Sequence, residues 1–170
     1  MEVFVQAIGL AAAAFGIAAF QIKKVRNLYI AQAMSSGLFV VQFYLLGGYA
    51  GAAMIIVDTI RALLLSTGKP FVKSKLFLVI SVCLGIIAYF ISTGSAALSV
   101  SYLTLIANIV CGIAFWSGQT KVIRYAQLCA VSPCWLVYSL CTGSIGGVVT
   151  QVLTMLSAVV FLIRTKKEIV

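Results

Sequence analysis

The chain alternates between long apolar runs and short polar connections, and this pattern divides it into seven segments. Each run is close to the roughly 20 residues that an α-helix needs to cross the hydrocarbon core of a bilayer. Helices are expected because a segment in lipid must satisfy its backbone polar groups within itself. The predicted spans are Val3–Phe20, Leu28–Gly47, Tyr49–Ser66, Leu76–Ser92, Ala96–Trp116, Val122–Cys141 and Ile145–Ile163.

The composition excludes a soluble protein. Of the 170 residues, 63% are hydrophobic and 9% are charged, whereas a soluble domain averages about 25% charged residues. A chain of this length has no core large enough to bury so much apolar surface, and disordered chains require low hydrophobicity. The sequence therefore predicts a multi-pass, all-α transmembrane protein.

The basic residues alternate from one connection to the next. They lie between the first and second runs, at the end of the third run and in the loop after it, around the connection between the fifth and sixth runs, and in the C-terminal tail, and the intervening connections carry none. The positive-inside rule then predicts an N-terminus outside and a C-terminus in the cytoplasm. In these positions the net charge of +9 faces anionic lipid headgroups, so nucleic acid is not an expected partner. The basic residues are Lys23, Lys24, Arg26, Arg61, Lys69, Lys73, Lys75, Lys121, Arg124, Arg164, Lys166 and Lys167.

Few side chains are available for catalysis or metal binding. The chain has no histidine, which is the commonest general base and metal ligand. Its five cysteines show no CxxC spacing, which argues against a zinc or redox motif, and we interpret them as small buried hydrophobes. We therefore expect a protein that is not an enzyme, with no catalytic residue, metal site or cofactor. The cysteines are Cys83, Cys111, Cys129, Cys134 and Cys141.

Two parts of the chain resemble each other at an offset of 96 residues, which indicates an internal repeat. The aligned identities are Gly16-Ile17-Ala18 with Gly112-Ile113-Ala114, Tyr29 with Tyr125, Ser36 with Ser132, Val41 with Val137, Gly47 with Gly143, and Gly51 with Gly147. The offset spans an even number of predicted crossings, so equivalent helices point the same way. We predict a 3+1+3 arrangement: a triple-helix repeat over 1–66, an inverting linker helix with its flanking loops over 67–95, and a second triple-helix repeat with a short basic tail over 96–170.

Paired glycines recur at the same place in both repeats. Gly47 and Gly51 lie at the predicted turn between the second and third runs, and Gly143 and Gly147 lie between the sixth and seventh. Glycine permits very tight turns, and Gly-xxx-Gly also permits close contact between membrane helices. Both interpretations stay open.

Several strings resemble the YgjV-type bacterial inner-membrane proteins. They are Phe43-Tyr44-Leu45-Leu46-Gly47, Tyr49, Gly51-Ala52, Ile60-Arg61, Cys134-Trp135 and Gly143-Ser144-Ile145-Gly146-Gly147. The resemblance covers nearly the whole chain and implies a location in the bacterial inner (plasma) membrane. More remotely, the layout is similar to the SWEET, semiSWEET and PQ-loop superfamily of solute carriers, although Phe20-Gln21 stands where that superfamily has Pro-Gln.

Asp58 is an acidic side chain deep inside the third run. An isolated aspartate at such a depth costs at least about 2.5 kcal/mol. Arg61 follows three residues later on the same helical face, and it is close enough to the cytoplasmic edge for its side chain to snorkel. Three interpretations stay open: a structural Asp58–Arg61 pair, contact with a solute or ion in a central cavity, and proton coupling through Asp58.

Other polar and aromatic side chains inside the runs are candidate solute contacts. Thr154 is the repeat counterpart of Asp58 and shares a helical face with Gln151, and such uncharged groups suit a neutral solute such as a sugar or polyol. Trp135 and Tyr138 resemble the sixth-helix aromatic arrangement that stacks on the solute in SWEET-like carriers. Interhelical hydrogen bonds and ordinary aromatic packing are the alternatives. The substrate-binding candidates are Asp58, Arg61, Asn108, Trp135, Tyr138, Gln151 and Thr154.

The leading hypothesis is a SWEET-like carrier of a small solute, a sugar or another small polar molecule, that works by alternating access around a central site. Gly37 and Pro133 are equivalent under the offset and are candidate hinges, since proline removes a backbone hydrogen bond and bends a helix. The alternative is a non-transporting membrane receptor or assembly protein on the same scaffold. The expected partners are the lipid bilayer and a small polar solute, and homo-oligomerisation stays open.

Overall fold

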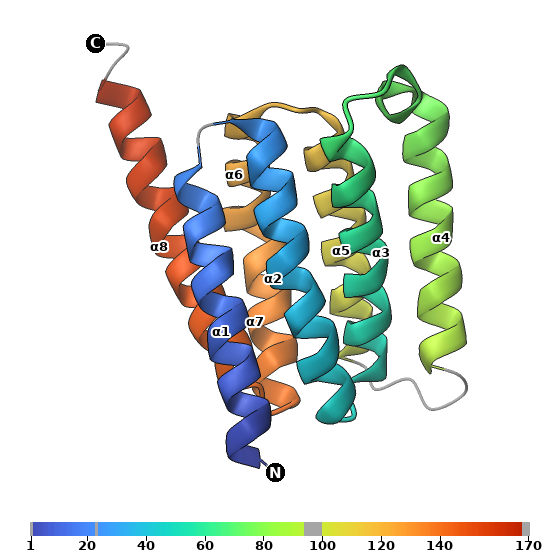
Figure 1. Ribbon diagram of the computed structural model, residues 1–170, viewed down its shortest axis with the longest axis vertical. Helices are drawn as coiled ribbons and strands as arrows, with labels where there is room; N and C mark the ends of the chain where they lie inside the picture. Colours follow the sequence, from blue (N-terminus) through green and yellow to red (C-terminus); the bar gives the residue numbers. More distant parts are fainter. Residues whose placement is uncertain (1, 23, 94–99, 168–170) are drawn as a thin grey trace.

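All regular structure in the described residues is helical. The computed structural model describes residues 2–22, 24–93 and 100–167, and no strand occurs in these ranges. The seven predicted runs correspond to helical segments, of which the sixth is divided into three consecutive pieces (Figure 1). The bounds are α1 (Glu2–Gln21), α2 (Val25–Leu45), α3 (Tyr49–Ser66), the 3₁₀ turn η1 (Pro70–Lys73), α4 (Lys75–Thr93), α5 (Ser101–Trp116), α6 (Thr120–Ala126), η2 (Gln127–Val131), α7 (Ser132–Cys141) and α8 (Ile145–Lys167).

Three of the described helices are long and apolar enough to cross a membrane. Their qualifying stretches are Arg26–Leu45 in α2, Tyr49–Ser66 in α3 and Lys75–Thr93 in α4. The helices α1, α5 and α8 carry shorter apolar stretches. The predicted start of the fifth span, residues 96–99, and Lys23 lie outside the described residues, and α5 begins at Ser101.

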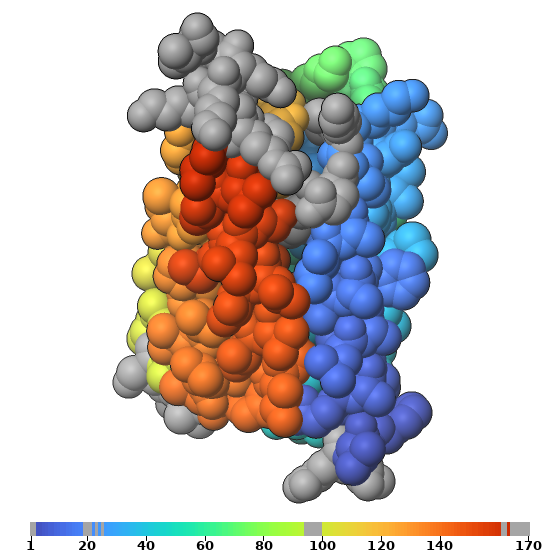
Figure 2. All heavy atoms as spheres, turned by 90° about the vertical axis from the view of Figure 1, so that its left-hand side faces the viewer, coloured from blue at the N-terminus to red at the C-terminus, as the bar shows by residue number. Residues whose placement is uncertain are grey.

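Six of the helical segments form a closed ring. Along one side, α1 packs against α2 and α2 against α3; along the other, α5 packs against α7 and α7 against α8. Contacts between α3 and α5 and between α1 and α8 close the ring, and Figure 2 shows α1 and α8 side by side. The helix α4 stands outside the ring at one edge, where it packs against α3 and α5 (Figure 1).

The connections that carry basic residues lie at one end of the molecule. Those after α1, α3 and α5 are all at the end where α8 terminates, and the N-terminus lies at the opposite end (Figure 1). They hold Lys24 after α1, Lys69 and Lys73 after α3, and Lys121 in the first turn of α6. We call this end the basic end, since the alternating charge pattern of the sequence is gathered on it.

The two turns at the opposite end have the same backbone geometry. Gly47 and Gly143 adopt φ angles of 75° and 69°, which favour glycine because other residues carry a Cβ. The next residue in each turn donates back into the helix, Gly48 to the carbonyl of Phe43 and Ser144 to that of Ser139, as in a Schellman motif. The tight-turn interpretation of these glycines is therefore confirmed.

The second glycine of each pair serves close packing. A Cβ on Gly51 would lie 2.5 Å from the ring of Tyr138, and one on Gly147 would lie 2.5 Å from Oγ of Ser139. Both neighbours belong to α7. The turn and the close helix contact thus occur together, four residues apart.

The sixth span is interrupted beside its proline. The five residues of η2 form a π-helix that ends immediately before Ser132 and Pro133. Proline has no N–H, and its ring clashes with the carbonyl four residues earlier. A π-turn accommodates both the missing hydrogen bond and the bulk of the ring. The counterpart helix α2 runs without a break through Gly37, so an irregular helix occurs at Pro133 and not at Gly37.

Most of the cysteines do not pack in the interior. Cys83, Cys129 and Cys141 are exposed on the protein surface, and Cys134 is half-buried. Only Cys111 is buried among the five. The prediction of small buried hydrophobes is therefore wrong for the three exposed residues, because an apolar residue in a membrane helix can face lipid as well as protein.

Candidate functional site

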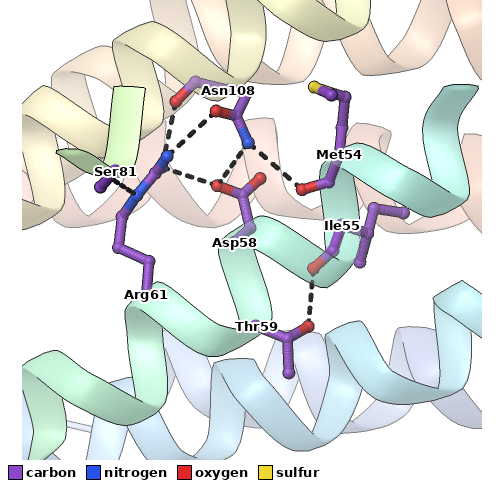
Figure 3. A network of polar contacts seen from close by, with 7 residues as sticks. All are labelled: Met54, Ile55, Asp58, Thr59, Arg61, Ser81 and Asn108. Carbon is purple, nitrogen blue, oxygen red and sulfur yellow. Dashed lines mark hydrogen bonds and ion pairs between the residues drawn. The ribbon is translucent and has the colours of Figure 1, made fainter. Parts of the chain in front are cut away.

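Arg61 on α3 points into the protein and is almost fully buried. It exposes 2% of its surface, and its Nη1 lies 2.7 Å from Oδ1 of Asp58, one turn earlier on the same helix. The predicted pair is therefore present, as Figure 3 shows. The prediction that Arg61 snorkels to the cytoplasmic edge is wrong, because the guanidinium finds its acceptors between the helices.

Two neighbouring helices complete this network of polar contacts (Figure 3). Arg61 donates from Nε to Oγ of Ser81 on α4 at 2.7 Å, and to Oδ1 and the backbone carbonyl of Asn108 on α5 at 3.0 and 3.1 Å. Nδ2 of Asn108 donates to Oδ1 of Asp58 at 3.0 Å and to the carbonyl of Met54 at 3.2 Å. We call Arg61 and its three side-chain partners the polar brace, since it ties α3 to α4 and α5.

The brace compensates the charge of Arg61 inside the bundle. A buried charge without a partner costs several kcal/mol, on the order of 3–5 when one member of a pair is removed. Here every nitrogen of the guanidinium donates a hydrogen bond, and a carboxylate lies beside it. Gly112 on α5 leaves room for this group, since a Cβ there would lie 2.7 Å from Nη1 of Arg61.

A cavity of about 70 Å³ lies inside the ring of helices. Its wall contains residues of α1, α2, α3, α5, η2, α7 and α8. Asp58 and Thr154, which are equivalent under the sequence offset, both line it. Asp58 therefore belongs to the brace through Oδ1 and lines the cavity as well.

Three buried oxygen atoms around this cavity have no hydrogen-bond partner among the described residues. They are Oγ of Ser139 on α7 and Oε1 of Gln151 and Oγ1 of Thr154 on α8, and all three residues line the cavity. Leaving a buried polar group unpaired costs about 1–3 kcal/mol. Water molecules or a hydrogen-bonding ligand in the cavity would recover this cost.

The structure brings four of the seven predicted contact residues to the cavity and keeps three away from it. Asp58, Trp135, Gln151 and Thr154 line the cavity. Arg61 and Asn108 belong to the brace and are absent from the described lining. Tyr138 points toward the start of α3, where its hydroxyl accepts a hydrogen bond from the backbone N–H of Gly51 at 2.9 Å.

Trp135 forms part of an aromatic cluster beside the cavity. Its ring lies 5.9 Å from that of Phe43 on α2 and 5.7 Å from that of Tyr138, measured between centroids. Phe43 also lines the cavity. Aromatic side chains from both halves of the ring therefore line the cavity, Phe39 and Phe43 from one and Phe115 and Trp135 from the other.

Several site residues carry no signal in the sequence, among them Ser81 and Ser139. Ser81 accepts a hydrogen bond from Arg61, and Ser139 places an unpartnered hydroxyl at the cavity. Serine is common at interfaces between membrane helices, so neither residue stands out in the sequence. The repeat offset gives no signal either, because the counterpart of Ser139 is Phe43.

At the basic end, a side-chain contact joins α2 to α5 above the cavity. The hydroxyl of Tyr29 on α2 donates to the carbonyl of Phe115 on α5 at 2.7 Å, and the two rings meet edge to face at 5.5 Å. Beyond them lies a crevice of about 670 Å³ whose lining includes Arg26 and Lys73. Phe115 lines both the crevice and the cavity, so it forms part of the wall between them.

A network of side-chain hydrogen bonds lies at the opposite end. Gln6 on α1 donates to the carbonyl of Gly143 at 3.0 Å and accepts from Gln42 on α2 at 3.2 Å. Ser144 donates to Oε1 of Gln42 at 3.1 Å. The backbones of α1 and α8 also approach closely, since a Cβ on Gly146 would lie 2.4 Å from Gly9.

Comparison with known proteins identifies the family to which the chain belongs. The family model Imp-YgjV, described as "Bacterial inner membrane protein", matches residues 3–169, and the match therefore extends over nearly all the described helices. No curated protein and no solved structure matches the chain. Within the described residues, no group of three or more His, Cys, Asp or Glu side chains could hold a metal ion.

Proposed function

The chain belongs to the Imp-YgjV family of bacterial inner membrane proteins, and we propose that it carries a small polar solute across that membrane by alternating access. The observation that supports this proposal is the central cavity, where Ser139, Gln151 and Thr154 present unpartnered buried oxygen atoms beside the carboxylate of Asp58. A purely structural bundle has no reason to keep several unpaired polar groups around one internal space. A carrier needs no catalytic group or cofactor, and the proposal includes neither.

We further propose that the helices form two parallel triple-helix repeats with α4 as the linker, as in SWEET-like carriers. The 96-residue offset makes α1 equivalent to α5, and α3 equivalent to α8. The contact between α1 and α8 is therefore equivalent to the contact between α5 and α3, and both contacts occur. The equivalent turns at Gly47 and Gly143 share their geometry. Repeats of this kind are related by an axis along the membrane normal and can rock about a central site.

The basic end is proposed to face the cytoplasm. Lysine and arginine near the ends of spans set the orientation of a multi-pass protein, and the connections that carry them lie together at one end (Figure 1). This orientation places the N-terminus outside and the C-terminus in the cytoplasm. Tags at the two termini that report the same compartment would contradict it.

The size of the cavity limits the solute in this conformation. A water molecule takes up about 30 Å³ in the liquid, so a cavity of about 70 Å³ holds roughly two of them. We therefore propose that the solute is small, no larger than glycerol or urea, and that a hexose is excluded.

The chemistry of the wall favours a neutral solute that donates hydrogen bonds. The positive charge of Arg61 is committed to Asp58 and Asn108, so the pair brings no net charge to the cavity. The amide oxygen of Gln151 accepts only, and the hydroxyl of Thr154 accepts and donates. Hydroxyl or amide N–H groups on the solute would complement these oxygens.

The cavity is proposed to open first at the basic end. A side-chain hydrogen bond from Tyr29 to Phe115 joins the two halves there, and Phe115 stands between the cavity and the crevice at that end. Separating Tyr29 from Phe115 costs about 1 kcal/mol for the hydrogen bond and would connect the two spaces. The crevice beyond Tyr29 would then form the mouth on that side.

Flux measurements on the purified chain in proteoliposomes test the proposal. Glycerol, urea, glucose, acetate and ammonium are the probes, and we expect flux of glycerol or urea and none of glucose. Thr154→Val should lower that flux about fivefold, which corresponds to roughly 1 kcal/mol for one hydrogen bond. The matched control is Thr93→Val, because Thr93 is half-buried and donates to the carbonyl of Tyr89 away from the cavity. The absence of flux for every probe, or an equal loss in both variants, would contradict a carrier.

A second candidate function is a non-transporting receptor or assembly protein on the same scaffold. The polar brace favours it, because hydrogen bonds from Arg61 to α4 and α5 suit a rigid frame. This candidate predicts a co-purifying partner or a stable homo-oligomer, and no flux. Cross-linking in native membranes, followed by mass determination, distinguishes it from the carrier.

A further inference from the structure

We propose that the groove between α3 and α4 binds an anionic phospholipid from the leaflet at the basic end. The groove has a volume of about 330 Å³ and is lined almost entirely by apolar side chains of α3, η1 and α4. Ile60 and Leu64 line it on α3, and Leu84 and Ile87 line it on α4; all four are exposed on the surface. This site is separate from the central cavity and does not depend on transport.

The groove is long enough for one acyl chain. Its lining residues on α4 extend from Phe77 to Ile91, a length of roughly 21 Å at about 1.5 Å for each residue. One leaflet contributes about 15 Å to the hydrocarbon core of a bilayer. The groove is therefore longer than one leaflet is deep, and an acyl chain that enters at the basic end can lie along it.

The innermost part of the groove requires an apolar occupant. Arg61 and Ser81 line the groove, although they expose only 2% and 6% of their surfaces. Their hydrogen bond of 2.7 Å is part of the polar brace. Water in the groove would compete for this bond, and an acyl chain would keep it dry.

The end of the groove carries positive charge for a phosphate headgroup. Phe71 in η1 lines the groove there, and Lys69 and Lys75 flank it in the chain with exposed side chains. The connection between Thr67 and Leu76 contains no acidic residue. Basic clusters next to membrane helices attract anionic lipids, whereas a second copy on this face would bring like charges together around a two-fold axis.

Lipid titration of the full chain in detergent micelles tests this site. Phosphatidylglycerol should raise the melting temperature by about 3 °C more than phosphatidylcholine does, and native mass spectrometry should show it retained. The double variant Lys69→Gln/Lys75→Gln should bind phosphatidylglycerol about 30-fold more weakly. The matched control Lys24→Gln/Lys121→Gln removes the same charge from the same end and should stay within about threefold of the unmodified chain.

A variant that fills the groove tests the acyl-chain half of the site. Leu84→Trp should abolish the specific effect of phosphatidylglycerol, and Val79→Trp should leave it unchanged, because Val79 is exposed on α4 outside the groove lining. If Leu84→Trp does not fold, the lysine variants still test whether the groove binds phosphatidylglycerol. Equal effects of the two lipids, equal losses in the two lysine variants, or a dimer that covers the groove without lipid would overturn the proposal.

Discussion

Arg61 on α3 donates two hydrogen bonds to Asn108 on α5, one to the side-chain Oδ1 at 3.0 Å and one to the backbone carbonyl at 3.1 Å. These two residues lie 47 positions apart in the chain, on opposite sides of the connection that contains α4. The same amide group of Asn108 donates to Asp58. One asparagine therefore holds both members of the intramembrane ion pair, and it joins the two halves of the bundle.

Removing one charge of the pair is expected to destabilise the protein strongly. Asp58→Asn leaves Arg61 buried without a counter-charge, and the free energy of unfolding in micelles should fall by about 3–5 kcal/mol. Arg61→Met should lower the free energy of unfolding by a similar amount, because it leaves the carboxylate of Asp58 without a counter-charge. The double variant should lose clearly less than the sum, which a double-mutant cycle measures. Additive losses would show that the two charges do not interact.

Adding a methyl group beside the guanidinium should also be costly. Gly112→Ala places a Cβ 2.7 Å from Nη1 and 2.8 Å from Cζ of Arg61, and the brace prevents that side chain from moving. We expect a loss of about 1–3 kcal/mol in unfolding free energy. Gly37→Ala is the matched control, since its Cβ meets nothing within 4 Å and a helix-interior alanine should stabilise by about 0.5–1 kcal/mol. If Gly112→Ala were more stable than Gly37→Ala, the close packing of Gly112 against Arg61 would be contradicted.

The contact between Tyr29 and Phe115 should control access to Cys111. Cys111 lines the cavity and is buried, so it can report opening once the other four cysteines are replaced. Tyr29→Phe removes one hydrogen bond, worth about 1 kcal/mol. A membrane-impermeant thiol reagent at the basic end should then label Cys111 about fivefold faster.

The control for this experiment lies at the other end of the molecule. Tyr44→Phe changes an exposed tyrosine that packs against Tyr49 near the turn between α2 and α3. It should leave the labelling rate unchanged. Labelling that accelerates only from the opposite end in Tyr29→Phe would mean that the cavity opens away from the basic end.

The two equivalent turns should respond equally to substitution. Gly47→Ala and Gly143→Ala force a Cβ into the left-handed region at φ angles of 75° and 69°, at a cost of about 1–2 kcal/mol each. Asparagine tolerates this region better, so Gly47→Asn should lose less stability. Thermal unfolding of the three variants checks the prediction, and a tolerated alanine at either turn would contradict the shared geometry.

The helical segments were largely predictable because their causes act locally along the chain. A run of about 20 apolar residues favours a helix wherever it occurs, and the helix bounds agree with the predicted runs to within a few residues. The ion pair was predictable for the same reason, since Asp58 and Arg61 are one turn apart on one helix. The break beside Pro133 follows from the missing N–H of a single residue.

The site was predictable only in part, because its members come from distant helices. Arg61 was expected to snorkel, and it turns inward because Ser81 and Asn108 provide acceptors that its own helix lacks. Tyr138 and Trp135 lie three residues apart on α7, yet only Trp135 lines the cavity. A rotation of the helix by a fraction of a turn decides between them, and the packing of neighbouring helices sets that rotation.

By itself, the sequence determined the helical segments, the charge asymmetry between the two ends and the spacing of Asp58 and Arg61 on one helical face. These properties depend on hydrophobicity, charge and spacings within one turn. Only the tertiary structure decided which side chains face the cavity, how Asn108 and Ser81 complete the brace, and where the groove between α3 and α4 lies. The reason is that these features depend on the rotation and position of helices far apart in the chain, and packing across the whole bundle fixes both.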